Sequence, residues 1–367
     1  WLTSGQNSQN SLGNIYSTGI KNNFLKKKIG KDKFKTLAFK STPLIFDDKI
    51  FYADDTGTIF CINKRGKVFW KINIYKKIYK KIYKTLTFSI DSGYIYVADN
   101  LGFLYSVNLN DGKIKWIKNH GIPIKSNVKI FESKIFVINQ DNRLLAFDLF
   151  DGKKLWDVRS ISSFIKPLSH LGLGVDKDGF ITMLGSSGDL LRVNARGRVI
   201  WSRSISGSIS LDENVFFETS DLNLIKNEII FSSSSSIFSI NSLNGYTNWK
   251  QEMKSTNTPI VDGENVFVVT DNGFLVNIER KTGVIVYSTK ILKILKKKKQ
   301  KTRISGFILG SGKIYITTLN GYLIVCSALT GKAEFFKKIG DTILSDPILS
   351  EGSLYILTEK SRILGFN

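Results

Sequence analysis

The sequence predicts an all-β fold: an eight-bladed β-propeller of four-stranded antiparallel blades, whose ring is closed by an N-terminal strand. Three observations lead to this prediction. Short runs of β-branched and aromatic residues alternate with Asp, Asn and Gly turns along the chain. A Gly-x-x-x-aromatic motif recurs seven times. Its aromatic residues are about 38 to 48 residues apart, which is the length of one propeller blade.

The stretch Gly93–Trp116 contains one complete unit of this repeat. Its first apolar run, Tyr94–Ala98, is followed by the turn signal Asp99–Gly102. A second run, Phe103–Val107, leads through the turn Asn108–Gly112 to a third run that ends on the tryptophan. Apolar residues at helical spacing are missing here, so we expect a meander of short antiparallel strands.

The aromatic residue of each motif is expected to be buried between two neighbouring blades, because a large flat ring removes much apolar surface from water. These blade anchors are Trp70, Trp116, Trp156, Trp201, Trp249, Tyr287 and Phe335. A hairpin turn precedes each motif, at Gly57, Gly102, Asn142, Gly188, Ser235, Gly273 and Gly321. A short polar side chain that can bond its own backbone ends the strand before five motifs, at Asn63, Asn108, Asp148, Asn194 and Asn241.

The two ends of the chain are expected to share the last blade. An eighth copy of the repeat begins at Gly352, but the chain stops at Asn367 before a fourth strand. Residues 24–30 have no blade of their own, so we expect them to complete blade eight and remove an open sheet edge. The predicted organisation is a single propeller domain over residues 1–367, with an extended segment at 1–23 and blades one to eight at 40–367.

The chain of 367 residues carries a formal net charge of +22, from 53 Lys and Arg against 31 Asp and Glu. Two interpretations remain open: a lysine-rich composition with no functional meaning, and contact with an anionic membrane surface or another polyanion. We expect no nucleic-acid partner.

Lysines concentrate in two segments. Ile74–Lys84 has Ile and Tyr at i, i+4 spacing, so it is either a short amphipathic helix or an extended outer strand and loop. Lys290–Arg303 lengthens the connection between blades six and seven.

The sequence contains few candidates for catalytic or metal-binding residues. Cys61 and Cys326 fall inside predicted strands and fit neither a zinc pattern nor a disulfide scaffold. His120 and His170 have no nucleophile or acid at recognisable spacing, so we expect them on the surface. Asp176–Gly179 lacks the further ligands of a calcium loop and is expected to form a tight turn. We expect no catalytic residue, no bound metal and no cofactor. The sequence also has no run of 18 or more apolar residues.

The repeat resembles the blade of the pyrroloquinoline-quinone-like propellers, whose units end on a Gly-x-x-x-Trp strand. The resemblance extends from about Lys40 to Phe366. Its enzyme branch, the quinone-dependent dehydrogenases, implies a calcium ion, a quinone and commonly a pair of adjacent cysteines. Cys61 and Cys326 are not adjacent. A non-enzymatic protein is therefore expected, and a dehydrogenase-like propeller is the alternative.

In the non-enzymatic branch, the chain is similar to the family of outer-membrane protein assembly factors, BamB. This similarity implies a scaffold on the periplasmic face of the outer membrane, lipid-anchored, that binds the periplasmic domains of a BamA-like barrel subunit. The family's partner contacts flank blade four. By position, the contact before that blade falls on Phe164, Ile165 and Lys166, and the contact after it falls near Glu218 and Asp221. The alternative for Phe164 and Ile165 is that they simply begin the inner strand of the blade.

Overall fold

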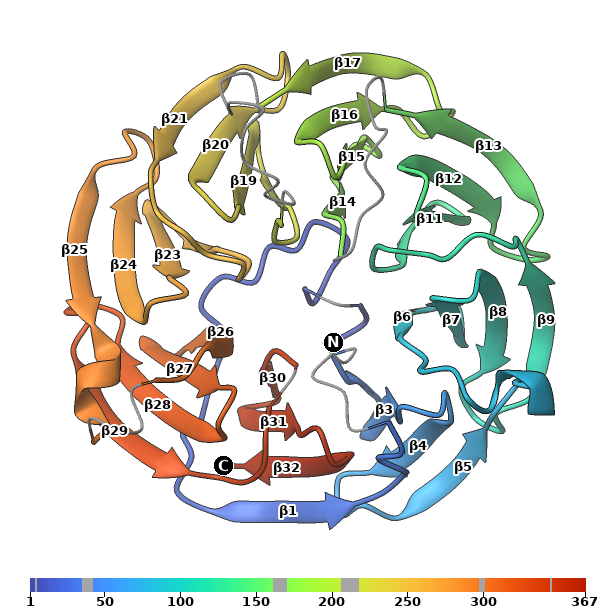
Figure 1. Cartoon of the computed structure of the whole chain (residues 1–367), viewed down its shortest axis with the longest axis horizontal. Coiled ribbons are helices and arrows are strands. Elements are labelled where there is room, and N and C mark those ends of the chain that lie inside the picture. The colour runs from blue at the N-terminus through green and yellow to red at the C-terminus, as the bar shows by residue number, and fades with distance from the viewer. Residues whose placement is uncertain (4, 35–41, 161–169, 206–217, 297–300, 344) are drawn as a thin grey trace.

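Short strands, each bounded by turn residues, pair antiparallel and surround a central axis (Figure 1). The structure is a computed structural model that describes residues 1–3, 5–34, 42–160, 170–205, 218–296, 301–343 and 345–367. These residues form eight sheets of four strands each. The first strand of each sheet is innermost and the fourth outermost. The prediction of an eight-bladed propeller is confirmed.

The first four blades follow one another along the chain. Blade one contains β2 (Leu44–Phe46), β3 (Lys49–Ala53), β4 (Ile59–Asn63) and β5 (Val68–Ile72). Blade two contains β6 (Leu86–Asp91), β7 (Tyr94–Asp99), β8 (Phe103–Asn108) and β9 (Ile114–Asn119). Blade three contains β10 (Lys129–Phe131), β11 (Lys134–Ile138), β12 (Arg143–Asp148) and β13 (Lys154–Arg159). Blade four contains β14 (Leu173–Val175), β15 (Ile181–Leu184), β16 (Asp189–Val193) and β17 (Val199–Ser204).

The remaining blades complete the ring. Blade five contains β18 (Asn223–Ile225), β19 (Glu228–Ser232), β20 (Ile237–Asn241) and β21 (Thr247–Gln251). Blade six contains β22 (Ile260–Asp262), β23 (Asn265–Val269), β24 (Phe274–Glu279) and β25 (Ile285–Lys290). Blade seven contains β26 (Ile304–Gly310), β27 (Lys313–Thr318), β28 (Tyr322–Ser327) and β29 (Ala333–Lys338). Blade eight contains β30 (Ile348–Ser350), β31 (Ser353–Leu357), β32 (Arg362–Phe366) and β1 (Asn23–Lys28).

The ring closes because β1 pairs antiparallel with β32, as the sequence predicted. In its register Leu25 lies opposite Gly365, which is the position that Trp70 takes opposite Cys61 in blade one. Leu25 is the buried residue of its strand, and a side chain at Gly66 of blade one would touch it. Leu25 is therefore the blade anchor of blade eight, a role that the Gly-x-x-x-aromatic motif did not reveal.

The tryptophan anchors fix the spacing between blades. The Trp70 ring packs on Gly112 of the next blade, and its indole N–H donates to the Leu109 carbonyl at 3.0 Å. The same pair of contacts recurs for Trp116, Trp156, Trp201, Trp249 and, through its hydroxyl, Tyr287. Phe335 departs from this arrangement and is 46% exposed. Its neighbour, blade eight, has no turn between its third and fourth strands, because β32 and β1 come from opposite ends of the chain.

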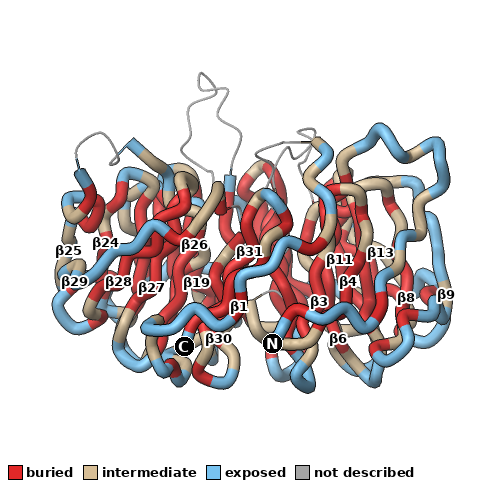
Figure 2. Tube along the Cα trace, turned by 90° about the horizontal axis from the view of Figure 1, so that it is seen from below, coloured by how far each residue is buried: buried red, intermediate tan, exposed pale blue. Residues whose placement is uncertain are grey.

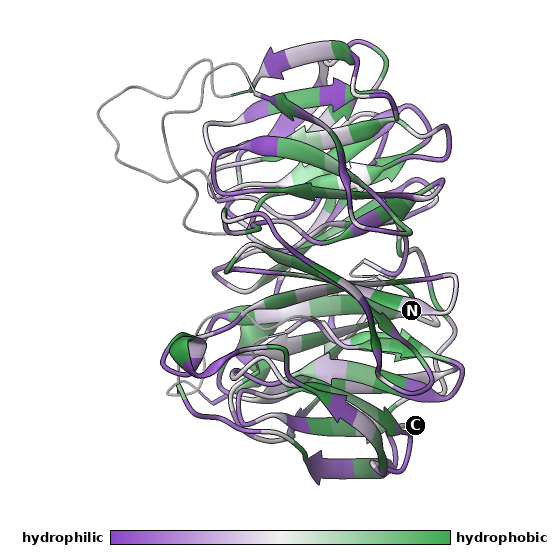
Figure 3. Cartoon of the chain, turned by 90° about the vertical axis from the view of Figure 1, so that its right-hand side faces the viewer, coloured by the Kyte–Doolittle hydropathy of each residue, from purple (hydrophilic) through white to green (hydrophobic). Residues whose placement is uncertain are grey.

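The core lies between the sheets. Apolar residues fill the inner strands and the blade interfaces, whereas the outer strands and turns carry the exposed positions (Figure 2). Figure 3 shows the same division as hydrophobic strand centres between hydrophilic turns. In one such cluster, Phe51 and Trp70 of blade one pack with Phe88 and Val97 of blade two. In the described part of the chain, helices are limited to short turns, and none is long and apolar enough to cross a bilayer.

The antiparallel order gives the propeller two different faces. One face, which we call the hairpin face, carries the turns between strands one and two and between strands three and four, such as Asp47–Asp48 and Lys64–Gly66. The opposite face, the crossover face, carries the turns between strands two and three and the connections from each outer strand to the next blade, such as residues 73–85. Both lysine-rich segments are connections on the crossover face.

Of the two alternatives for the first lysine-rich segment, the amphipathic helix is wrong: the segment is a loop that follows the outer strand β5 of blade one and leads to blade two. Within Ile74–Lys84 a single 3-10 turn, η1 (Lys77–Tyr79), is present. The Tyr75 hydroxyl donates to Asp99 of blade two at 2.6 Å, and this contact holds the tyrosine away from a continuous helical face. The second segment contains η2 (Ile291–Ile294), whose Ile291 and Leu292 are buried against blades six and seven.

Candidate functional site

The centre of the propeller is occupied by the N-terminal segment of the chain, residues 1–3 and 5–22, which we call the N-terminal plug. Figure 1 shows it in dark blue, crossing the middle of the ring before it reaches β1. Its backbone bonds to six blades. Trp1 accepts from Ile45 (3.2 Å), Leu2 from Ile90 (2.7 Å), Ser8 from Val175 (2.8 Å) and Gln9 from Leu224 (2.9 Å), while Ile15 donates to Leu309 (3.2 Å) and Thr18 to Gly352 (2.9 Å). The plug therefore satisfies inner-strand groups that would otherwise face the channel.

A buried lysine fixes the middle of the plug. The Asn10 side-chain amide donates to the carbonyls of Leu173 (2.9 Å) and Leu222 (2.8 Å), on blade four and next to blade five. Its oxygen accepts a hydrogen bond from Nζ of Lys129 on the inner strand of blade three, at 2.5 Å. Burial lowers the pKa of the Lys129 ammonium to about 8. Asn10 thus joins three blades, and Lys129 supplies the charge-assisted bond.

A second polar network lies beside the connections that flank blade four. Nε2 of His170, just before β14, lies 3.0 Å from Oδ1 of Asp221, just before β18. The Asn127 amide donates to the other carboxylate oxygen at 2.6 Å, and the Leu173 N–H donates to Oδ1 at 3.4 Å. Burial by itself raises the pKa of Asp221, but His170, Lys129 and Asn127 outweigh it and the pKa is lowered. The network joins the base of the connection before blade four to that of the connection after it.

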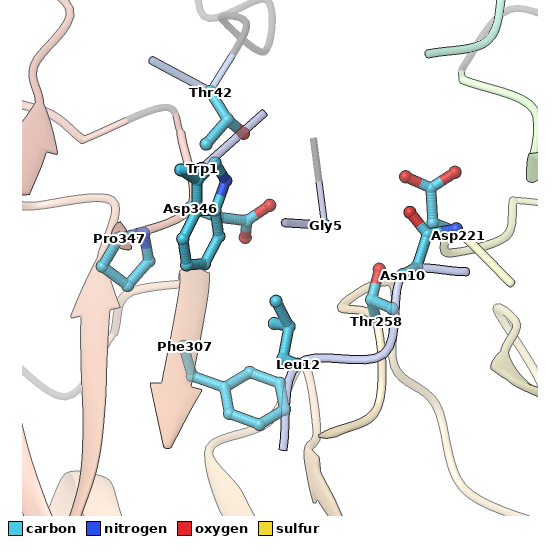
Figure 4. A pocket seen from close by; sticks show the side chains of 10 residues that line it. All are labelled: Trp1, Gly5, Asn10, Leu12, Thr42, Asp221, Thr258, Phe307, Asp346 and Pro347. Carbon is cyan, nitrogen blue, oxygen red and sulfur yellow. The ribbon is translucent and has the colours of Figure 1, made fainter. Parts of the chain in front are cut away.

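A small cavity separates the plug from blades seven and eight (Figure 4). Its volume is about 40 Å³, and its lining includes the carboxylates of Asp221 and Asp346. Burial, together with the nearby charge of Asp221, raises the pKa of Asp346 to about 7. Because one water occupies roughly 30 Å³ in the liquid, this space is suited to one or two waters.

The predicted partner-contact residues differ in their surroundings. Phe164, Ile165 and Lys166 lie outside the described residues. Glu218 is exposed on the crossover face, and its carbonyl accepts the Ser234 N–H at 2.9 Å. Asp221, only three residues later, is buried in the network with His170. The role of these residues as partner contacts stays a prediction.

The expectation that both histidines are ordinary surface residues was wrong. His170 is half-buried and paired with Asp221, and the His120 ring packs on Phe147 with 4.3 Å between centroids. The pair His170–Asp221 is separated by 51 residues, and no local spacing indicates it. The sequence does contain a signal for the buried Lys129, because this charged residue interrupts the apolar run of a predicted inner strand.

The cysteines are buried, and one acidic side chain shapes a turn. Cys61 on β4 and Cys326 on β28 are free thiols buried in strands, as predicted, and burial raises the pKa of each to about 12. Among the described residues, no three His, Cys, Asp or Glu side chains come together as a metal site. Asp176 forms the predicted turn, since its carboxylate accepts from the Asp178 and Phe180 amides at 3.0 and 2.9 Å.

Comparisons with known proteins agree with the repeat. A protein-family model described as outer membrane protein assembly factor BamB matches residues 55–289, more than half of the chain. The proteins of that name from Salmonella typhimurium (strain LT2) and Escherichia coli (strain K12) are 21% and 22% identical over 329 and 331 residues. Each alignment covers 86% of this chain and 81% of the relative.

Solved structures share the fold. BamB from Moraxella catarrhalis has a TM-score of 0.75 at 13% identity, over 94% of this chain and 99% of that one. A europium-containing methanol dehydrogenase has a TM-score of 0.74 at 11% identity, over 98% of this chain and 89% of that one. Such distant similarity shows the fold alone, which enzymes and assembly factors have in common. The match of the family model to most of the blades decides between them at the level of family: the chain belongs to the family of the outer membrane protein assembly factor BamB.

Proposed function

We propose that this protein is a non-enzymatic scaffold subunit of the outer-membrane β-barrel assembly machinery, and that it binds the periplasmic domains of a BamA-like barrel subunit. The main support is the plugged channel: the chain's own residues 1–3 and 5–22 fill the place where a propeller enzyme would need room for its substrate. In this proposal the protein works at the periplasmic face of the outer membrane and is held there by a lipid anchor. Its rigid ring presents the crossover-face connections to partners.

The size of the central cavity favours the scaffold over the dehydrogenase alternative. Sites for small molecules and cofactors usually have volumes of roughly 300–1,000 Å³. The space between the plug and blades seven and eight is about 40 Å³. Binding a quinone there would require the plug to leave, which would break the backbone bonds to six blades and the Asn10–Lys129 bond. An absorption spectrum of the purified protein tests this alternative, and a quinone chromophore would refute the proposal.

The proposed contact with the barrel subunit lies on the two connections that flank blade four. Phe164 and Ile165 supply an apolar centre, and Lys166 and Glu218 supply flanking charges, an arrangement typical of protein interfaces. Asp221 supports this surface, because its bond to His170 joins the ends of the two connections, and its bond to Asn127 ties them to the connection before blade three. We propose a second, electrostatic contact for the lysine-rich connections, with an anionic membrane surface.

Co-purification with the barrel subunit of the same organism tests the first contact. Phe164→Ala combined with Lys166→Glu should abolish co-purification. The matched control combines Leu329→Ala with Lys332→Glu on the hairpin face, where Leu329 is 87% exposed, and should bind normally. Both variants must keep the circular dichroism of the wild type. Retained binding by the blade-four variant would exclude this site, and no binding by the wild-type protein would exclude the function.

A further inference from the structure

One connection on the crossover face presents apolar side chains to solvent on a rigid support. We call residues 74–83, between β5 and β6, the Ile78 loop. In Figure 1 its short helical turn lies at the right-hand rim, next to blade two. Ile78 is 78% exposed and Ile82 is 41% exposed. Solvent-exposed isoleucines so close together on a connection are costly to hydrate, so the Ile78 loop is suited to contact an apolar phase.

The other side of the Ile78 loop is firmly attached to the propeller. The Tyr75 ring meets the Phe103 ring of blade two edge-on, with 6.2 Å between centroids, and the Tyr79 ring does the same at 5.8 Å. The Lys84 ammonium donates to the Tyr79 carbonyl at 2.5 Å. These contacts fix the tyrosines inward, and the 3-10 turn then directs Ile78 outward. The exposure of Ile78 is thus a consequence of the packing of its neighbours.

Lysines surround the two isoleucines. Lys76, Lys77, Lys80 and Lys81 are all exposed, and no ion pair involves them within the described part of the chain. Cations elsewhere on the molecule have acidic partners: Lys64 with Asp48 and Glu351, Arg280 with Glu228 and Lys313 with Glu334 on the hairpin face, and Lys360 with Asp341 on the crossover face. The second lysine-rich connection adds exposed Lys290, Lys293 and Lys296 to the crossover face. The two isoleucines of the Ile78 loop are therefore exposed among four lysines that form no ion pair with the described acidic residues.

We infer that the Ile78 loop is a membrane-surface contact, in which Ile78 and Ile82 enter the headgroup region of an anionic phospholipid layer and the four lysines bind its phosphates. Apolar side chains and a ring of lysines act together at such surfaces, because the apolar part is buried while the ammonium groups remain at the charged interface. This inference deepens the proposed membrane contact of the lysine-rich connections. It rests on the proposed function only in placing the protein near a membrane.

Co-sedimentation of the full chain with lipid vesicles tests this inference without the barrel subunit, so it can fail or succeed independently of partner binding. The vesicles contain phosphatidylcholine alone or mixed with phosphatidylglycerol. Two variants remove one component of the contact each: Ile78→Ser with Ile82→Ser, and Lys76→Ser with Lys77→Ser, Lys80→Ser and Lys81→Ser. Two controls make the same changes on the hairpin face: Leu243→Ser with Leu329→Ser, and Lys153→Ser with Lys177→Ser, Lys226→Ser and Lys332→Ser.

The wild-type protein should bind the anionic vesicles and not the neutral ones. Each loop variant should weaken binding by about tenfold or more, since both components contribute to the contact. The hairpin-face controls should bind within about twofold of the wild type, although the second loses the same net charge. Binding that is unaffected by the isoleucine variant, or lowered equally by both lysine variants, would overturn the inference and indicate non-specific attraction to a polyanion. Absence of wild-type binding to anionic vesicles would also overturn it.

Discussion

Leu25→Ala is the sharpest test of how the ring is closed. Leu25 is 3% exposed and lies on the strand that joins the N-terminus to the last blade. It packs in one cluster with Ile45 and Ile50 of blade one and with Tyr355 and Ile363 of blade eight. Truncation would leave a cavity between blade eight and blade one, beneath the strand whose pairing with β32 joins the two ends of the chain.

The expected cost of Leu25→Ala is about 2–5 kcal/mol of unfolding free energy, the usual range for a buried leucine. That is a large share of the roughly 5–15 kcal/mol that keeps a typical domain folded. Urea unfolding followed by tryptophan fluorescence measures it. Hydrogen exchange shows which part of the ring is destabilised, because the amides of β1 and β32 should exchange faster while those of blade four change little.

The matched control for Leu25→Ala is Leu329→Ala, the same substitution at a residue that is 87% exposed. It should change the unfolding free energy by no more than about 0.5 kcal/mol. Equal unfolding midpoints for the two variants would refute the assignment of Leu25 as the blade anchor. Faster exchange spread evenly over all blades would refute the local closure.

Three further predictions concern the blade interfaces and the cavity. Trp201→Phe removes the indole N–H that donates to the Ser242 carbonyl at 2.8 Å, and should lower the unfolding free energy in urea by about 1–3 kcal/mol. Gly112→Ala, whose methyl would lie 2.8 Å from the neighbouring indole, should destabilise more than Gly93→Ala. Both glycines have positive φ, but a methyl added at Gly93 would meet nothing within 4 Å. The pKa of Asp346 in the folded protein, about 7, lies above the 3.8 of an unperturbed Asp side chain, so the stability that this group contributes is present below pH 3.8 and is lost as the pH rises through 7. Asp346→Asn should therefore gain up to about 4 kcal/mol over the wild type at pH 8 and little near pH 4, measured by urea unfolding at both pH values.

The blades could be read from the sequence because the signals that define them are local. Asn63 accepts hydrogen bonds from the Arg65 and Lys67 amides at 3.0 and 2.8 Å, so the turn residue acts within its own hairpin. In each motif an aromatic residue such as Trp116 follows its glycine at the same distance. One copy of this motif is a weak signal, but its repetition along the chain predicts the fold. Turn residues and aromatic anchors that repeat along the chain therefore predict a ring of blades, even though a single hairpin of this kind would be ambiguous.

The Ile74–Lys84 segment shows where local signals mislead. Its i, i+4 spacing of Ile and Tyr is typical of an amphipathic helix, yet one 3-10 turn forms. Asp99 and Phe103 of the next blade take the tyrosine side chains, so tertiary contacts outweigh the weak helical preference of a short segment. No pattern within the segment could indicate this, because its partners belong to another blade.

The eight blades, their four-stranded order and the closing strand can be predicted from the amino-acid sequence, since turn residues and aromatic anchors act over a few positions of the chain. The contents of the channel and the surroundings of blade four follow instead from the folded ring. Asn10 meets Lys129, and His170 meets Asp221, because the ring brings inner strands from distant blades around one axis. Contacts of that kind depend on the closed circle as a whole, so no spacing along the chain encodes them.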